Sequence, residues 1–331
     1  MKNNKQLVFS PFLGIIAVTS IFALLISCNT RSSSNPIQQI NLSSDHHIDD
    51  LVIVNRNVYM KDYLDYMDSL SLALADSLGY DLNEYTLVHR NSWIIDSLRA
   101  TDYYLLKDRN IFIEDPLSIK LLSRNDTLWI PGPGFVDSLK ALFGMVTIDV
   151  NIPEFLLRIK IGEVILHTFP VRVGQNRRKY LAMAGKAIDL RTKKGIGKIV
   201  RISRDPTYIN PSNNRVYYST KRDDGKITKL PRIPWLEPEI NGQRHGQLIH
   251  PTTNPVTLGK AYSNGCIGVK ESDMWMIYYY APLNTSVTIR YDREVTDDEG
   301  NVIFLPEVYP GYGNNKIVGS YDEGSCCICN L

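Results

Sequence analysis

Two residues of this 331-residue chain have the types and the spacing of a catalytic pair. Cys266 follows a glycine, Gly265, and His250 lies 16 residues before the cysteine. A cysteine attacks as a thiolate, and a nearby imidazole can accept the thiol proton. Gly265 permits a tight turn, whose backbone N–H groups can form an oxyanion hole. The spacing therefore fits nucleophilic catalysis, although it also fits a buried, inert thiol.

The distribution of cysteines favours the catalytic interpretation. The chain has five, namely Cys28, Cys266, Cys326, Cys327 and Cys329. This pattern is not the disulfide framework of a small secreted fold. The three cysteines near the C-terminus lack the second half of a zinc site, so no metal is expected. If Cys28 is modified, Cys266 is the only cysteine in the body of the protein.

The surroundings of the pair resemble the signature of the L,D-transpeptidase (YkuD-type) family, an Ile-His-Gly-Thr segment followed by Ser-x-Gly-Cys-Ile-Arg. The matching positions are Ile249, His250, Thr252, Asn254, Pro255, Gly259, Ser263, Gly265, Cys266 and Ile267. Upstream, 155–159 and 169–174 look like the opening hairpin of that domain, and 284–289 look like its final strand. The resemblance covers about residues 146–292.

Three positions depart from the family signature. Asn264 replaces the commonest residue, histidine, and Pro251 replaces a glycine and cannot donate a backbone hydrogen bond. Gly268 replaces the arginine that follows Cys-Ile. Because that arginine could hold an acidic substrate or the local fold, we predict that an arginine at position 268 is tolerated and raises activity.

The resemblance implies a cofactor-independent acyl transfer on peptidoglycan stem peptides. His250 would take the proton of Cys266, and the thiolate would attack the carbonyl of the third residue of a tetrapeptide stem. The terminal D-alanine would leave, and an amine of a second stem or of an anchored protein would resolve the thioester. Backbone N–H groups around Gly265 and Cys266 would stabilise the oxyanion. A carbapenem, which mimics the acyl donor, is the expected covalent inhibitor.

Four further residues near the pair are candidates for binding substrate. Ser263 and Asn264 belong to the signature itself, and Ser263 is also expected to shape the turn. Arg244 could meet a substrate carboxylate and so partly replace the missing arginine. His245 could hold substrate or position His250, but an ordinary loop histidine is the simpler interpretation.

Two alternative functions remain open at this stage. With water as the acceptor, the same acyl-enzyme would make the protein an L,D-carboxypeptidase. A catalytically weak cell-wall-binding lipoprotein is the other possibility, and Gly268 and Pro251 favour it. The intact pair of Cys266 and His250 favours an enzyme.

The pattern of residues 146–292 predicts a mainly β domain, a β-sandwich with one packed helix. The resemblance implies that this is an L,D-transpeptidase-like catalytic domain. Apolar residues alternate from Val146 to Val150, and a hairpin is expected with its turn at 161–163. The expected helix is 273–280, and the closing strand is 286–291. We expect this domain to fold without the residues before it.

Residues 48–145 read as a smaller, mostly helical unit. Apolar residues recur at helical spacing, namely Leu64, Met67, Leu70, Leu74 and Leu78, with Gly79 as the expected end. A second helix is expected over 93–106. Residues 293–331 are polar and rich in glycine, which predicts an irregular C-terminal tail.

The first residues predict export. Lys2 and Lys5 precede a nearly unbroken apolar run, which ends in Leu-Ile-Ser-Cys at Cys28. Such a segment is typical of a signal peptide, here 1–27, with Cys28 as a lipidated first residue and 28–47 as a tether. An uncleaved membrane anchor is the alternative. Both place the chain in the bacterial cell envelope, and the lipid-anchored form would face the periplasm.

Composition and charge exclude some classes of partner. The hydrophobic fraction of 44% and the charged fraction of 22% are ordinary for a globular protein. The formal net charge is only +2, and no basic tract with interleaved aromatic residues occurs. A nucleic-acid partner is therefore not expected.

Overall fold

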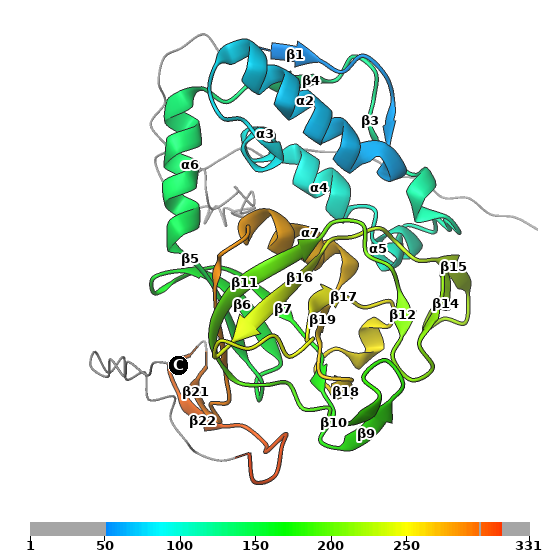
Figure 1. Cartoon of the computed structure of the whole chain (residues 1–331), viewed down its shortest axis with the longest axis vertical. Coiled ribbons are helices and arrows are strands. Elements are labelled where there is room, and N and C mark those ends of the chain that lie inside the picture. Colours follow the sequence, from blue (N-terminus) through cyan, green and yellow to red (C-terminus); the bar gives the residue numbers. More distant parts are fainter. Residues whose placement is uncertain (1–50, 298, 313–331) are drawn as a thin grey trace, which may run out of the picture. The chain divides into compact units, whose positions relative to one another are not determined.

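The computed structural model describes residues 51–297 and 299–312 of the chain, and its elements are drawn in Figure 1. The predicted signal peptide, Cys28, the tether up to residue 47 and the three C-terminal cysteines lie outside these ranges. A search of the described residues finds no helix with the length and apolar character needed to cross a membrane.

The first part of the described chain is mostly helical, as predicted. Its helices are α2 (Tyr63–Leu78), α3 (Glu84–Arg90), α4 (Trp93–Arg99), α5 (Tyr103–Asp108) and α6 (Pro133–Met145), with 3-10 turns η1 (Met60–Asp62) and η2 (Pro116–Ser118). Four short strands pair as β1 (Leu51–Ile53) with β4 (Thr127–Trp129), and β2 (Val58–Tyr59) with β3 (Lys120–Leu122).

The first predicted helix is confirmed, and the second is divided. α2 ends at Gly79, whose φ of 76° is left-handed and typical of a helix end. The helix expected over 93–106 is instead α4 and α5. The Asp102 side chain accepts a hydrogen bond from the Tyr104 N–H, so a new helix begins there.

The second part of the chain is built on one eight-stranded sheet, in the order β19-β17-β16-β11-β20-β5-β6-β7. Its strands are β5 (Val146–Asn151), β6 (Leu156–Ile161), β7 (Val164–Pro170), β11 (Gly195–Ser203), β16 (Trp235–Ile240), β17 (Ile249–Pro251), β19 (Ile267–Val269) and β20 (Ser286–Arg290). Two of the neighbouring pairs are parallel, β17 with β19 and β20 with β5. The predicted fold class, mainly β with one packed helix, is confirmed, with eight of its strands in one continuous sheet.

Smaller strand pairs lie outside this sheet. They are β8 (Val173–Gly174) with β18 (Ala261–Ser263), β9 (Arg178–Leu181) with β10 (Lys186–Asp189), β12 (Ile209–Asn210) with β13 (Arg215–Val216), and β14 (Ser219–Lys221) with β15 (Ile227–Lys229). The sequence did not predict these pairs as separate from the main sheet. β18 leads into the turn that carries Cys266, so this short pair helps to place the nucleophile.

The helix α7 (Glu271–Tyr280) joins the two parts into one core. All ten of its residues are buried, and it contacts α3 and α4 as well as β16 and β17. The Tyr63 and Tyr279 hydroxyls lie 2.7 Å apart, and one hydrophobic cluster runs from Val54 to Tyr309 through both parts. This packing does not support our expectation that 146–292 folds alone. The exact domain boundaries stay a prediction.

Part of the predicted C-terminal tail is packed on the catalytic domain. β21 (Glu294–Thr296) and β22 (Val302–Phe304) form a hairpin. Tyr309 is fully buried, and its hydroxyl donates to the Gly174 carbonyl over 2.6 Å and accepts from the Thr192 N–H over 3.2 Å. Thr192 in turn holds the turn of the nucleophile, so this segment supports the site.

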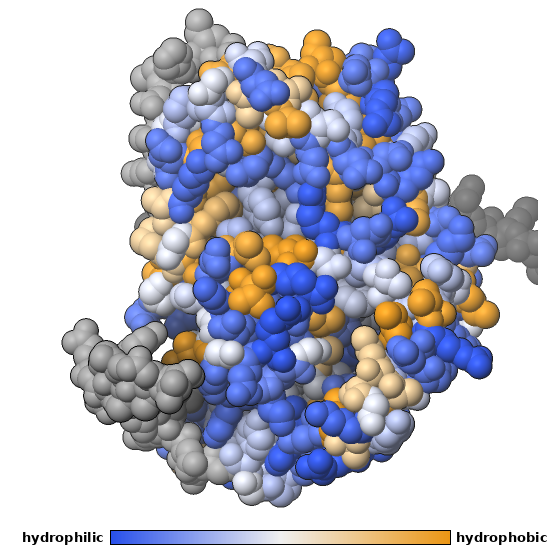
Figure 2. All heavy atoms as spheres, viewed as in Figure 1, coloured by the Kyte–Doolittle hydropathy of each residue, from blue (hydrophilic) through white to orange (hydrophobic). Residues whose placement is uncertain are grey.

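The surface in Figure 2 shows apolar side chains in small groups among hydrophilic ones. Exposed apolar residues elsewhere include Leu51 and Ile53 on β1, which are 51% and 63% exposed. The face shown in Figure 2 carries no broad apolar patch.

Candidate active site

The pairing of the parallel strands β17 and β19 places His250 beside the segment that carries Cys266. His250 is the middle residue of β17 and lies opposite Gly268 of β19, and Cys266 immediately precedes β19. Both side chains are half-buried, and Cys266 is a free thiol. The separation of 16 residues in sequence is therefore bridged by a direct strand pairing.

A hydrogen-bonded turn fixes the backbone of Cys266. The Ser263 Oγ donates to the Cys266 carbonyl over 2.6 Å and accepts from the Gly265 N–H over 3.2 Å. Gly265 has a φ of 111°, a conformation that side chains with a Cβ rarely adopt. The Thr192 Oγ1 donates to the Gly265 carbonyl over 3.0 Å, so both the N–H and the carbonyl of Gly265 are held.

The same turn decides which N–H groups are free to bind an oxyanion. The Gly265 N–H, which the sequence suggested for this role, is already bonded to Ser263. The Leu248 N–H donates to the Cys266 Sγ over 3.4 Å. Within the described ranges the Cys266 N–H has no hydrogen-bond partner. The available donor beside the thiol is therefore the N–H of Cys266 itself.

His250 has the tautomer that a general base requires. Its Nδ1 lies 2.8 Å from the Pro251 carbonyl, and because a carbonyl only accepts, Nδ1 carries the hydrogen. Nε2 is then unprotonated. Trp235 packs against the imidazole, with the ring centres 5.5 Å apart. The hydrogen bonds of the described residues do not join His250 to Cys266, and such bonds often form only when substrate is bound.

The electrostatic environment keeps the His250 imidazole and the Cys266 thiol neutral before the reaction. Burial, together with the charge of Arg172, lowers the pKa of His250 to about 4, against the effect of the Pro251 carbonyl. Burial raises the pKa of the Cys266 thiol, and the Leu248 N–H and Arg172 oppose this rise. At neutral pH, His250 is an unprotonated base and Cys266 is a thiol that needs one.

The comparison with protein families decides the identity of this domain. Residues 145–289 match the family model described as the L,D-transpeptidase catalytic domain, YkuD. These residues are an L,D-transpeptidase catalytic domain. The expected resemblance is thereby confirmed over nearly the range that the sequence suggested. No curated protein matches the chain.

Several solved structures are similar to this L,D-transpeptidase domain. They include an L,D-transpeptidase from Xylanimonas cellulosilytica (13% identity, 57% of this chain and 79% of that chain, TM-score 0.33). L,D-transpeptidase 3 from Mycobacterium tuberculosis with a faropenem-derived adduct has 14% identity over 44% and 60%, with a TM-score of 0.28. The E. faecium catalytic domain acylated by ertapenem has 16% identity over 44% and 96%, with a TM-score of 0.29. TM-scores this low do not establish a common fold, and the identification depends on the family model.

The other residues suggested for the L,D-transpeptidase site differ in their surroundings. Arg244 pairs with Glu237, its Nε 3.0 Å from Oε1 and its Nη2 2.7 Å from Oε2, so its charge is already compensated. His245 is exposed, and Asn264 is half-buried. Ser263 is buried within the turn, where both of its hydrogen bonds serve the backbone.

Four residues of this region were not singled out as functional from the sequence. Arg172 and Trp235 lie beside the pair, and Thr192 and Tyr309 hold the nucleophile turn. Each comes from a segment distant from Cys266 in the chain, and the resemblance of 169–174 to the opening hairpin assigned no functional role to Arg172. Sequence signals of the kind that identified Cys266 could not have found them.

The prediction that arginine is tolerated at position 268 is not supported. A Cβ placed on Gly268 would lie 2.5 Å from the Arg172 Nε and 2.8 Å from its Cγ. Distances below 3.0 Å do not occur between such atoms, so Arg172 would have to move. A side chain at position 268 is thus incompatible with the present position of the Arg172 side chain.

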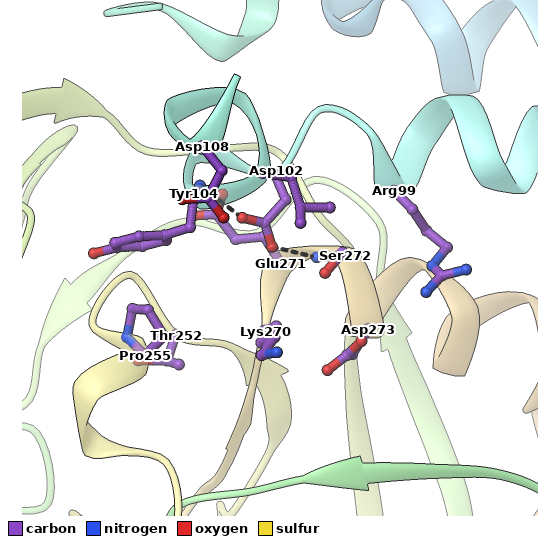
Figure 3. A pocket seen from close by; sticks show the side chains of 11 residues that line it. Arg99, Asp102, Tyr104, Asp108, Thr252, Pro255, Lys270, Glu271, Ser272 and Asp273 are labelled. Atoms are coloured by element: carbon purple, nitrogen blue, oxygen red, sulfur yellow. Dashed lines mark hydrogen bonds between the residues drawn. The ribbon is translucent and has the colours of Figure 1, made fainter. Parts of the chain in front are cut away.

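A cavity of about 240 Å³ lies between α5, the segment after β17 and the start of α7 (Figure 3). Asp102 bridges two helix starts there, because its Oδ1 accepts from the Tyr104 N–H and its Oδ2 from the Ser272 N–H. A second cavity, of about 390 Å³, is lined by charged residues that include Asp149 and Arg290. Neither cavity is lined by Cys266 or His250, and the described ranges hold no cluster of three potential metal ligands.

Proposed function

We propose that the protein is a peptidoglycan L,D-transpeptidase that forms a thioester on Cys266. The observation that carries the proposal is the His250 ring, which is held with a free Nε2 on the strand beside Cys266. The fixed turn, the unbonded Cys266 N–H and the family of the domain support it.

In the first half of the reaction, a donor peptide acylates the enzyme. The Nε2 of His250 accepts the thiol proton as Sγ attacks the carbonyl of the third residue of a tetrapeptide stem. The carbonyl oxygen becomes an oxyanion, which the Cys266 N–H stabilises. The amide bond breaks, His250 returns its proton to the departing amine, and D-alanine leaves.

In the second half, an acceptor resolves the thioester. An amine of a second stem or of an anchored protein attacks the thioester carbonyl, and His250 takes one proton from it. The new amide forms and the thiol of Cys266 is restored. Water in place of the amine would give an L,D-carboxypeptidase. The experiment must therefore identify the acceptor from the products.

We also propose that this reaction takes place in the cell envelope. The apolar run that ends at Cys28 supports export, lipidation of Cys28 and an orientation towards the periplasm. We expect Cys28→Ala to block acylation by lipid and to retain precursor-sized protein. A mature N-terminus at another residue would contradict the lipid anchor.

Incubation of the purified protein with disaccharide-tetrapeptides, followed by mass spectrometry, tests the activity. We expect crosslinked dimers with wild-type protein and none with Cys266→Ala. Tripeptide products without dimers would favour the carboxypeptidase. Folded protein that gives no product would favour the binding lipoprotein.

A further inference from the structure

Arg172 occupies the place that a side chain at position 268 would need. It lies between β7 and β8. Its backbone N–H donates to the Gly268 carbonyl over 2.9 Å, and its carbonyl accepts from the Gly268 N–H over 3.0 Å. The Arg172 Cγ, Cδ and Nε all lie within 3.1 Å of a Cβ built on Gly268. The arginine that the family signature carries after Cys-Ile and the arginine at position 172 would therefore compete for one space.

Among the residues that the structure describes, the guanidinium of Arg172 has no acidic partner. Its Nη1 makes one long hydrogen bond, 3.3 Å to the Thr257 Oγ1, and its Nε is buried without a partner. In the part of the chain that the structure describes, no carboxylate lies within 4.0 Å of it. The half-buried Arg158, Arg204 and Arg290, in contrast, each pair with a carboxylate.

The charge of Arg172 acts directly at the reacting groups. It opposes the rise in the pKa of the Cys266 thiol and adds to the fall in the pKa of His250. An arginine that is partly removed from water and left without an anion is energetically unfavourable. Such a group next to a nucleophile is suited to an anion that arrives with the substrate, because a guanidinium matches the two oxygens of a carboxylate.

We propose that Arg172 binds the terminal carboxylate of the donor peptide. This inference rests on the proposed function, in which the residue that leaves is the last of the stem. Its carboxylate is then only one residue beyond the carbonyl that Cys266 attacks. The donor class is accordingly a peptide that ends, with a free carboxylate, one residue after the bond that is cut.

Binding to the inactive Cys266→Ala protein separates this role from catalysis. The probes are a tetrapeptide stem with a free terminal carboxylate and the same peptide with a terminal carboxamide. We expect the acid to bind roughly 10- to 100-fold more tightly than the amide, the usual range for a hydrogen bond to a charged group. With Arg172→Gln added, the two affinities should become nearly equal, whereas Arg172→Lys should keep part of the preference.

Arg244→Gln is the matched control, because Arg244 is also an arginine of this domain but already pairs with Glu237. It should leave the preference for the acid unchanged. A purely structural role of Arg172 would weaken acid and amide alike, and that result would overturn the proposal. Equal or undetectable binding of the two peptides before Arg172 is changed would also overturn it.

Moving the arginine provides a second test in the same assay. Gly268→Arg alone should lose the preference, because it displaces Arg172. Gly268→Arg combined with Arg172→Ala removes the contact and should restore at least part of the preference. Failure of the proposed function would appear elsewhere, as wild-type protein that is not acylated at Cys266 by either peptide.

Discussion

The region in which α3 packs against α7 and the turn that carries Cys266 both bury polar groups, but they differ in how these groups are hydrogen-bonded. Where α3 packs against α7, Glu84 accepts hydrogen bonds from the Tyr278 and Tyr279 hydroxyls and from the Arg204 Nη2. Beside the nucleophile, the guanidinium of Arg172 contacts no carboxylate within the described part of the chain. The polar groups of the first region join the helical part of the chain to the catalytic domain. The second region keeps hydrogen-bond donors available to a ligand.

This difference has a physical meaning. A buried carboxylate is tolerated when its oxygens receive several hydrogen bonds, and removing one partner from such a cluster is costly. An unpaired donor lowers stability and is retained where a ligand completes it. Substitutions between α3 and α7 should therefore change mainly the stability of the fold. Substitutions near the turn that carries Cys266 should change mainly the rate of the reaction.

Removal of the helical part should have the largest effect. In a fragment of 146–292, the tyrosines and the tryptophan of α7 would be exposed to water. In the longer chain they are at most 1% exposed (Tyr278, Tyr279, Tyr280 and Trp275). We expect this fragment to aggregate or to lack fixed tertiary structure, whereas a chain that starts at residue 48 folds. A fragment with a cooperative unfolding transition and dispersed NMR signals would show that the two parts are separable.

His250→Ala should slow acylation by a carbapenem by roughly 10²- to 10⁴-fold at pH 7, the usual contribution of a general base. Since the pKa of His250 is about 4, the wild-type rate should be nearly constant from pH 6 to 8. The defect should shrink at high pH, where the thiol ionises without a base. Stopped-flow fluorescence or timed mass spectrometry can follow the rate.

The exposed His245 provides the control for that measurement. His245→Ala should change the rate only slightly. If His245→Ala stopped acylation and His250→Ala did not, the assignment of the base would be wrong.

Glu84→Ala should lower the free energy of unfolding by roughly 3–5 kcal/mol, because it removes the buried acceptor of the Tyr278 and Tyr279 hydroxyls and leaves Arg204 only its exposed partner. Asp68, which pairs with the same Arg204 but is exposed, is the control. Asp68→Ala should cost less than about 1 kcal/mol. Urea unfolding would measure both, and equal effects would contradict the contrast between buried and exposed partners.

His89, which packs against α7, should make stability depend on pH. Its Nε2 donates to the Tyr279 carbonyl over 2.8 Å, its Nδ1 is buried without a partner, and burial lowers its pKa to about 4. The folded protein resists protonation there, while the unfolded chain takes up the proton below about pH 6.5. The stability from the neutral ring is complete above that pH and is lost as the pH falls to 4.

His89→Gln should therefore flatten the pH profile. Between pH 7 and 4, the wild-type protein should lose roughly 3 kcal/mol more than the variant, which follows from a pKa difference of about 2.5 units. Urea unfolding at several pH values would measure the difference. Parallel profiles of the two proteins would show that His89 does not titrate in this way.

The sequence predicted the elements whose signals are local. The alternation from Val146 predicted β5, the spacing in α2 predicted that helix, and Gly79 marked its end. The family signature predicted that Cys266 and His250 meet; His250 lies on β17, and Cys266 immediately precedes β19, the strand that pairs with β17. Each of these features is encoded by residues close together in the chain.

The remaining features depend on contacts between distant segments. The relation between Arg172 and Gly268 cannot be read from either residue, because it exists only after β19 lies beside 172. The role of Ser263 in the turn was expected, but its bond to the Gly265 N–H, which occupies that donor, required the folded backbone. Tyr309 looked like part of an irregular tail and is instead fully buried.

The most direct test of the central claim is the site of covalent modification by a carbapenem. Adduct formation requires the thiol, its base and the oxyanion donor, but no acceptor amine, so it tests the catalytic centre alone. Peptide mapping by mass spectrometry should place one adduct on Cys266 of the wild-type protein and none on folded Cys266→Ala. An adduct on Cys326, Cys327 or Cys329, or a folded wild-type protein that forms no adduct, would contradict the assignment.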